Sequence, residues 1–320
     1  MRKRIQILAL LLVLQLLLAA GLLLPGTPLD RTASASAPLL RFEASAVDRL
    51  TIEGPEEASV TLARRDGQWQ VEGDDPFPAD GKRIEELLER LAKLHGGDVV
   101  GTTDAARARF KVDDGSFERR ITLAAGNRTL ATLYGGTSPA LRRLHVRVGG
   151  EDEIRVAELA AYEIPVQAKD WRDAKVLAIP KDEIAAIEID GLRIERSPRA
   201  DADEAKEADE ATPAWTAAGA DDGAELDQEA ADKLARALAD LRFDDVLGTE
   251  AKPEYGLDRP ALRLAVMRSD GGRVEYRLGK AADREEYTLK ASTRPEYFRL
   301  ASWAARSLVE AAGRDALLSP

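Results

Sequence analysis

The feature that most constrains the fold of this chain is an internal repeat. The stretch GGDVVGTTDAARARFKVDD at residues 96–114 is echoed by FDDVLGTEAKPEYGLDRP at residues 243–260. Both stretches combine a hydrophobic step, a Gly-Thr pair, a short polar run and an aromatic-x-aliphatic-Asp turn. The flanking sequence repeats in the same order, so we expect a tandem duplication with units at about 47–180 and 184–320.

Each copy opens with short strands. VDRLTIEG at 47–54 and IAAIEIDG at 184–191 alternate apolar and polar residues, as half-buried strands do. A second strand follows, and then a strand centred on Trp69 or Trp215; in the first copy, Asp66-Gly67 is typical of a tight hairpin turn. We expect both tryptophans to pack in a core rather than to stack on a ligand.

An amphipathic helix is predicted next in each copy. Asp80 and Asp227 stand where an N-cap belongs, because a short carboxylate can accept hydrogen bonds from the free amides of the first turn. Apolar residues at helical spacing follow, and Gly96-Gly97 is expected to stop the first helix. Three leucine pairs are each 147 residues apart: Leu87 and Leu234, Leu91 and Leu238, and Leu94 and Leu241. This match indicates a shared packing face.

Antiparallel strand pairs and a short closing helix complete each copy, and the tails align Arg172-Asp173 with Arg314-Asp315. Strands joined by short turns, with one long helix, predict an α+β fold rather than a parallel doubly wound sheet. The expected architecture is two tandem copies of an antiparallel-sheet-plus-helix unit after an N-terminal transmembrane helix. We assign the first repeat to 42–180 and the second to 181–320, with a disordered acidic loop at 197–213 that lacks large apolar residues.

The N-terminus indicates where the protein resides. MRKR places three cations before IQILALLLVLQLLLAAGLLL, an apolar run of twenty residues interrupted by Gln6 and Gln15. A helix of this length spans about 30 Å, the thickness of a hydrocarbon core, whereas a cleavable signal peptide has an apolar region of only about 7–15 residues. We therefore expect an uncleaved transmembrane signal anchor at 1–24 and a tether at 25–41. Cleavage near ASASA at 33–37 is the alternative, and in both cases the bulk of the chain is exported.

Composition excludes several kinds of chemistry. The chain has no cysteine, which rules out disulfides, thiolate nucleophiles and cysteine-ligated metal sites. Its net charge of −11 disfavours nucleic-acid binding, and the longest basic cluster (Arg142, Arg143 and Arg147) is expected on the outer face of a strand. His95, at the end of the first predicted helix, and His145, in a strand, occupy non-equivalent positions. We expect both to be structural rather than metal ligands or general bases.

Adjacent carboxylates raise the question of a cation or glycosidase site. The pairs are Asp74-Asp75, Asp113-Asp114, Asp221-Asp222 and Asp244-Asp245. Calcium loops place ligands at alternating positions with a closing Glu, and only DDGS at 113–116 begins in that way. With 57 acidic residues, chance pairs are expected, and no nucleophile elbow or phosphate-binding glycine loop is present. We predict no catalytic, cofactor-binding or metal-binding residues, no cofactor and no enzymatic activity.

Several motifs together resemble the bacterial family called domain of unknown function 4340 (DUF4340). They are the tryptophan strand, VVGT and VLGT, YGLDRPALRL, YRLG and DWRD. The most specific segment is Tyr255–Pro260; FKVD at 110–113 lacks its glycine and proline, so a differently built turn is expected there. The resemblance implies one N-terminal transmembrane helix, genes encoded beside ABC-type transport components that resemble the gliding-motility auxiliary system, and no established catalytic residues.

Two functions from different classes follow. The first is a non-enzymatic periplasmic interaction subunit, held by a single pass in the bacterial inner (cytoplasmic) membrane, with ABC-type transport or envelope components as partners. The alternative is a ligand-binding or carbohydrate-processing protein with a site in a cleft between the repeats. Such a cleft would be lined by carboxylates and aromatic residues such as Tyr255, Tyr287 or Tyr297. A rigid spacer above the membrane is a third, structural, role.

Overall fold

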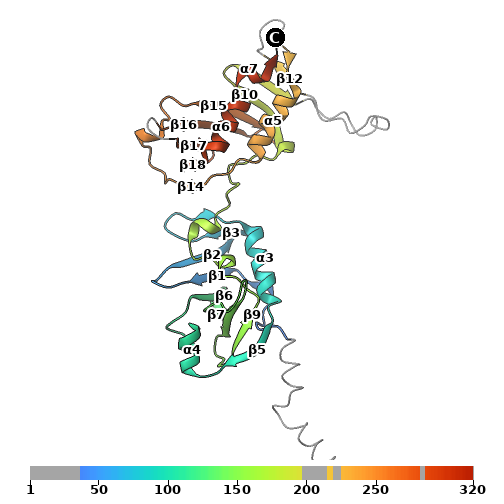
Figure 1. Cartoon of the computed structure of the whole chain (residues 1–320). Coiled ribbons are helices and arrows are strands. Elements are labelled where there is room, and N and C mark those ends of the chain that lie inside the picture. The colour runs from blue at the N-terminus through green and yellow to red at the C-terminus, as the bar shows by residue number, and fades with distance from the viewer. Residues whose placement is uncertain (1–36, 197–214, 219–224, 282–284, 320) are drawn as a thin grey trace, which may run out of the picture. The chain divides into compact units, whose positions relative to one another are not determined.

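The computed structural model describes residues 37–196, 215–218, 225–281 and 285–319. The chain divides into two compact units, unit 1 (Met1–Asp173) and unit 2 (Ala174–Pro320) (Figure 1). The expected anchor at 1–24 and the expected acidic loop at 197–213 lie outside the described residues. No described helix combines the length and the apolar character that crossing a bilayer requires.

The division between the units falls earlier than the sequence indicates. The first residues after Asp173 pack in unit 2, where the buried Tyr276 hydroxyl donates a hydrogen bond to Leu177 O at 2.6 Å. At the start of unit 1, Leu40 lies within the expected tether but is 3% exposed in the core. The segment 174–180 therefore belongs with unit 2, and the packed part of unit 1 begins before residue 42.

Unit 1 is built on a nine-stranded antiparallel sheet of order β4-β3-β2-β1-β6-β7-β8-β9-β5. Its strands are β1 (Arg49–Glu53), β2 (Ser59–Arg65), β3 (Gln68–Val71), β4 (Phe77–Pro78), β5 (Gly96–Gly101), β6 (Arg119–Ala125), β7 (Arg128–Gly135), β8 (Leu144–Val148) and β9 (Ile154–Ala157). Its helices are α3 (Gly81–Ala92) and α4 (Asp104–Phe110), with 3-10 turns η1 (Ala44–Ala46), η2 (Ala161–Glu163) and η3 (Ala168–Trp171). The apolar side of α3 packs on the sheet and forms the core with it (Figure 1).

Unit 2 has an eight-stranded antiparallel sheet of order β12-β11-β10-β15-β16-β17-β18-β14 and a separate pair, β13-β19. Its strands are β10 (Ile184–Ile189), β11 (Leu192–Arg196), β12 (Trp215–Ala218), β13 (Glu225–Leu226), β14 (Asp245–Val246), β15 (Leu262–Arg268), β16 (Arg273–Lys280), β17 (Tyr287–Ala291), β18 (Phe298–Leu300) and β19 (Leu318–Ser319). Its helices are α5 (Gln228–Ala239), α6 (Ser302–Ala311) and α7 (Arg314–Leu317), with 3-10 turns η4 (Lys181–Glu183) and η5 (Pro253–Tyr255). Apart from β4, the two main sheets have the same strand order. Both units are α+β, as predicted.

The two long helices correspond residue by residue. The carboxylate of Asp80 accepts from the Arg83 amide, and that of Asp227 accepts from the amides of Glu229 and Ala230, which confirms both predicted N-caps. The buried positions of α3 are Ile84, Leu87, Leu88 and Leu91, and the matching positions of α5 are Ala231, Leu234, Ala235 and Leu238. The predicted shared packing face is therefore correct.

Both predicted core tryptophans are buried, Trp69 with 4% and Trp215 with 3% of its surface exposed. An arginine guanidinium lies over each ring, Arg64 at 5.1 Å and Arg196 at 5.2 Å from the ring centroid. The polar edge of the indole differs: Trp215 Nε1 donates to Asp232 Oδ1 at 3.0 Å, whereas Trp69 Nε1 has no partner among the described residues. The packing is thus shared, but its polar contact is specific to unit 2.

Two local expectations require correction. The first long helix ends at Ala92 without the glycines, and Gly96 instead begins β5. The tails are also offset from the predicted alignment, because the amide of Asp80 donates to Trp171 O and that of Asp227 donates to Leu317 O. Trp171 therefore corresponds to Leu317, whereas the predicted alignment pairs it with Gly313.

The repeated motif, at 96–114 and 243–260, contains a left-handed residue at the matching position in both units. Gly256 adopts a left-handed φ of 65°, and Lys111 adopts a left-handed φ of 55° at the matching position. The backbone of this turn packs directly against a glycine of a neighbouring segment in both units. A Cβ on Gly279 would lie 2.0 Å from Tyr255 O, and one on Gly136 would lie 1.9 Å from Phe110 O. The left-handed residue is therefore shared, whereas the element before it differs, since α4 leads into the turn in unit 1 and the 3-10 turn η5 does so in unit 2.

Candidate functional site

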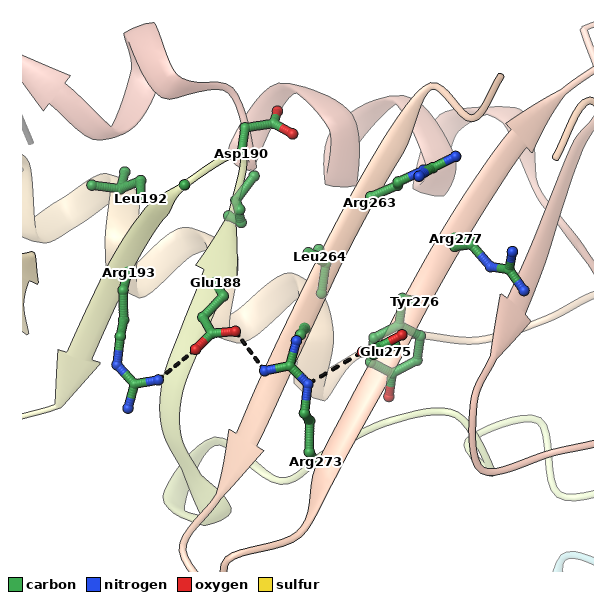
Figure 2. A pocket seen from close by; sticks show the side chains of 13 residues that line it. Glu188, Asp190, Leu192, Arg193, Arg263, Leu264, Arg273, Glu275, Tyr276 and Arg277 are labelled. Atoms are coloured by element: carbon green, nitrogen blue, oxygen red, sulfur yellow. Dashed lines mark hydrogen bonds and ion pairs between the residues drawn. The ribbon is translucent and has the colours of Figure 1, made fainter. Parts of the chain in front are cut away.

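The main candidate site is a hollow of about 640 Å³ on one face of the unit 2 sheet (Figure 2). Strands β10, β11, β15 and β16 line it, and charged side chains project from them. Alternation along the strands separates the two faces. Leu264 and Tyr276 are buried on the core side, whereas Arg263, Glu275 and Arg277 are exposed in the hollow.

One part of the hollow holds a chain of ion pairs. Glu188 lies between two arginines, with a carboxylate oxygen 2.5 Å from Arg193 Nη1 and the other 2.5 Å from Arg273 Nη1 (Figure 2). Arg193 also pairs with Glu195, and Arg273 pairs with Glu275 at 3.2 Å. Three acidic side chains thus compensate two arginines.

The charges of this chain of ion pairs are mutually stabilised. Hydrogen bonds from Arg273 and then Arg193 lower the pKa of the Glu188 carboxyl below its ordinary value. The hydrogen bond to Glu188 likewise raises the pKa of the Arg273 guanidinium. These pKa shifts favour the charged forms of Glu188 and Arg273, and the three carboxylates more than offset the charge of the two arginines.

The neighbouring row of the sheet is different, because cations stand side by side. Arg263 is directly opposite Arg277 in the β15–β16 ladder, and Arg277 is directly opposite Lys290 in the β16–β17 ladder. Like charges in directly opposed positions repel one another. Within the described part of the chain, neither Arg263 nor Arg277 has an acidic partner, and Asp190 is the only acidic residue lining that end of the hollow.

Lys290 is affected by this arrangement. Burial lowers the pKa of its amine, Glu296 partly offsets that effect, and Arg277 lowers the pKa further. The amine donates to Arg294 O and Pro295 O, each at 2.6 Å, so it is held by the loop after β17. Arg263 and Arg277 are therefore the two cations of the row that remain available to an incoming anion.

The chemistry that this hollow offers is anion recognition. The planar guanidinium group matches the geometry of carboxylate and phosphate groups and is less strongly hydrated than an ammonium group. Ala265 occupies the middle of the floor between Glu188 and Glu275, and its small side chain leaves the centre open. An acidic group could thus reach Arg263 and Arg277 without displacing the ion pairs next to them.

The histidines and carboxylates singled out in the sequence lie elsewhere. His95 is exposed after α3, whereas His145 is 9% exposed, lies 2.9 Å from Thr137 Oγ1 through its Nδ1 and stacks on Phe110. Asp114 pairs with Arg147 at 2.5 Å, and Asp245 pairs with Arg299 at 3.0 Å. Across the described ranges, no three His, Asp or Glu side chains are grouped as metal ligands would be. Asp221-Asp222 lies outside these ranges.

The tyrosines named for the alternative function belong to the packing of unit 2. Tyr255 is 7% exposed and Tyr287 is 5% exposed, and the rings of Tyr255 and Tyr297 lie 5.1 Å apart. None of the three lines the hollow.

The sequence did contain a signal for the missed pair Arg263 and Arg277. A turn at Asp270-Gly271-Gly272 joins β15 to β16, and this hairpin places the two arginines opposite one another. Counting outward from that turn pairs position 263 with position 277, and the alternation along each strand places both side chains on the solvent-facing side.

The family description "Domain of unknown function (DUF4340)" matches residues 69–260, which is more than half of the chain and includes the repeated motif in both units. No curated protein and no solved structure matches the chain.

Proposed function

The chain belongs to the DUF4340 family, and we propose that it is a non-enzymatic interaction subunit, anchored by its N-terminal segment in the bacterial inner membrane with its two units in the periplasm. Its partners are ABC-type transport or envelope components. The two units derive from a tandem duplication, and the arginine face of unit 2 is the docking surface. We define the arginine face as Arg193, Glu188, Arg273, Glu275, Arg263 and Arg277.

The anchor is supported by the sequence. The twenty-residue apolar run at 5–24 follows three cations, a pattern that holds its positive end in the cytoplasm and directs the remainder outward.

The observation that carries the docking surface is the Arg263–Arg277 row, which has no acidic partner among the described residues. Two facing guanidinium groups repel one another in the free protein, and an acidic group placed between them relieves that repulsion. The adjacent ion-pair chain orders the rest of the face and contributes no excess positive charge, because its two arginines pair with three carboxylates. An acidic segment of a membrane-protein partner fits these properties, because its charge complements the row and orients the encounter.

Purification from native membranes tests this function. The full chain, solubilised in mild detergent, is expected to co-purify with transport components encoded beside it. The double variant R263E/R277E is expected to lower that recovery by about tenfold or more, because acidic side chains would then face an acidic partner.

Arg242 provides a matched control. It is an exposed arginine that follows α5, away from the hollow, and R242E makes the same charge change as one of the two substitutions. R242E should retain partner recovery at the wild-type level. A wild-type chain that elutes alone, or a double variant that retains its partner, would overturn the proposal.

A further inference from the structure

The first described residues of the chain dock at one end of unit 1. Pro38 forms a β-bridge with His95, and the Leu39 amide donates to Leu94 O at 2.7 Å. Leu40 then enters the core. The chain therefore joins unit 1 beside the residues that follow α3, which places this end nearest in sequence to the predicted membrane anchor.

An exposed leucine projects near that end from a well-defined turn. Leu141 is 90% exposed, in the connection between β7 and β8. The turn is closed by a hydrogen bond from the Arg143 amide to Ala140 O at 3.1 Å. Ser138 Oγ donates to both Ala140 O and Arg143 O, each at 2.8 Å. Because these contacts hold the backbone, the exposure of Leu141 is a fixed feature of the surface.

A second exposed apolar ring lies on the neighbouring turn η2. Tyr162 is 63% exposed, and the next residue, Glu163, pairs with Arg90 of α3 and lies 3.9 Å from Arg142 Nη2. The same Glu163 carboxylate also accepts from the Ala160 amide at 2.9 Å, which fixes η2. Glu163 thus joins the end of α3, the turn that carries Leu141 and the turn that carries Tyr162.

Cationic side chains lie close to the turns that carry Leu141 and Tyr162, and one of these cations, Lys93, pairs with Glu89 at 3.3 Å. A hollow of about 460 Å³ between the joined elements is lined by Arg90, Lys93, Leu94, His95, Arg142, Glu158 and Glu163. Arg143 is exposed, and no acidic partner for it occurs in the described part of the chain. The expectation that Arg142, Arg143 and Arg147 share a strand face was wrong, since Arg142 and Arg143 belong to the turn and Arg147 is 3% exposed.

We propose that Leu141, Tyr162, Arg142, Arg143 and Lys93 form a membrane-facing surface that rests on anionic phospholipid. The inference depends on the proposed anchor, since the anchor brings this end of unit 1 to the bilayer. Leucine and tyrosine side chains partition into the headgroup region, while arginine and lysine side chains contact lipid phosphates.

The length of the connection is compatible with this contact. Twelve residues, 25–36, separate the end of the predicted span from Ala37. They can extend over at most about 45 Å, which allows the surface to reach the bilayer and also to leave it. The surface thus sets how unit 1 is oriented on the membrane, which the tether alone does not specify.

The lack of cysteine permits a direct test. The full chain with Leu141→Cys, labelled with an environment-sensitive fluorophore, is placed in nanodiscs that contain phosphatidylglycerol and a headgroup-proximal doxyl lipid. The label at residue 141 is expected to be quenched by the doxyl group. A label on Asp75→Cys, an exposed position beside β4 at the opposite edge of the sheet, should not be quenched.

Charge variants test the lipid specificity. R142Q/R143Q, in the L141C background, should lower the ratio of docked to undocked label by about fivefold for each arginine removed. R142K/R143K should restore quenching, because it keeps the charge. Equal quenching in discs of phosphatidylcholine alone would overturn the assignment of an anionic lipid.

Recovery of the chain in the discs separates the two proposals. A chain that stays in the nanodisc while residue 141 remains in water overturns the membrane-facing surface only. A chain that cannot be retained in the disc overturns the anchor, and with it the proposed function.

Discussion

At the scale of single residues, the two units place different side chains at the same left-handed backbone position. The turn that ends the repeated motif needs a left-handed residue, and unit 2 supplies Gly256 whereas unit 1 supplies Lys111. A residue with a Cβ adopts this conformation at a cost of about 1–2 kcal/mol. The sequence showed the missing glycine in the first repeat, but it could not show that tertiary contacts would impose the same left-handed conformation on a lysine.

Exchanging the residues at this turn should therefore have opposite effects in the two units. Lys111→Gly should stabilise unit 1 by about 1 kcal/mol, because the left-handed strain is relieved. Gly256→Ala should destabilise unit 2 by about 1–3 kcal/mol, since the new Cβ would lie 2.2 Å from Lys280 O. Hydrogen exchange measured by mass spectrometry on peptides from each unit reports both changes. Glu118→Gln controls for the lost Lys111–Glu118 ion pair.

Asp232 gives a second prediction at this scale. Its mostly buried carboxylate contacts Trp215 Nε1 at 3.0 Å and Lys181 Nζ at 3.1 Å, whereas Glu85, at the matching position of α3, is 59% exposed. Asp232→Ala should destabilise unit 2 by about 1–3 kcal/mol, because it leaves a buried indole N–H without an acceptor. Glu85→Ala should change the stability of unit 1 by less than about 1 kcal/mol. Equal effects on the two units would contradict the special role of the Trp215 contact.

The same carboxylate predicts an acid dependence. Burial acts to raise the pKa of Asp232, but hydrogen bonds from Trp215 and Lys181 outweigh it, and the pKa lies below its ordinary value. A carboxyl with a lowered folded-state pKa stabilises the fold above about pH 4, and that contribution is lost as the pH falls through the folded-state value. Unit 2 of D232N should lose less stability between pH 6 and pH 3 than wild-type unit 2, measured by hydrogen exchange corrected for the intrinsic pH dependence.

At the scale of elements, the long helices were predictable and some strands were not. Leucine spacing and the aspartates before the first turn predicted α3 and α5, because both signals lie within the helical segment itself. Gly96-Gly97 resembled a helix stop, yet it begins β5, since the sheet supplies hydrogen bonds that glycine propensity does not anticipate. The predicted alignment of the tails was wrong because it paired the two Arg-Asp dipeptides with one another. The hydrogen bonds that the Asp80 and Asp227 amides donate, to Trp171 O and to Leu317 O, give the correct correspondence.

The two N-caps can be compared directly. Asp227 accepts from two backbone amides, at 2.9 and 3.0 Å, and Asp80 accepts from one at 3.1 Å. Asp227→Ala should cost α5 about 1–2 kcal/mol, and Asp80→Ala should cost α3 about 0.5–1 kcal/mol. Hydrogen exchange of the first-turn amides measures each loss. Asp227→Asn should restore most of the protection in α5, and failure to do so would show that the cap is not the cause.

At the scale of the whole molecule, the sequence predicted more about architecture than about the site. The α+β class follows from strand alternation and the repeated order of elements, both of which are visible in the linear sequence. The arginine face depends on which strands become neighbours: Glu188 and Arg273 are far apart in sequence, and only the pairing of β10 with β15 and β15 with β16 brings them together. Non-local pairing of this kind is not visible in composition or short motifs.

At this scale, the proposed function requires an anchored chain with its bulk outside the inner membrane. A single cysteine at Trp303, which is 74% exposed on α6, can be labelled in otherwise cysteine-free chains. We predict that W303C reacts with a membrane-impermeant maleimide once the outer membrane is permeabilised, that R4C reacts only after the inner membrane is lysed, and that both chains resist alkaline carbonate extraction. Release of the intact chain by carbonate, or protection of residue 303 until the inner membrane is lysed, would contradict the account.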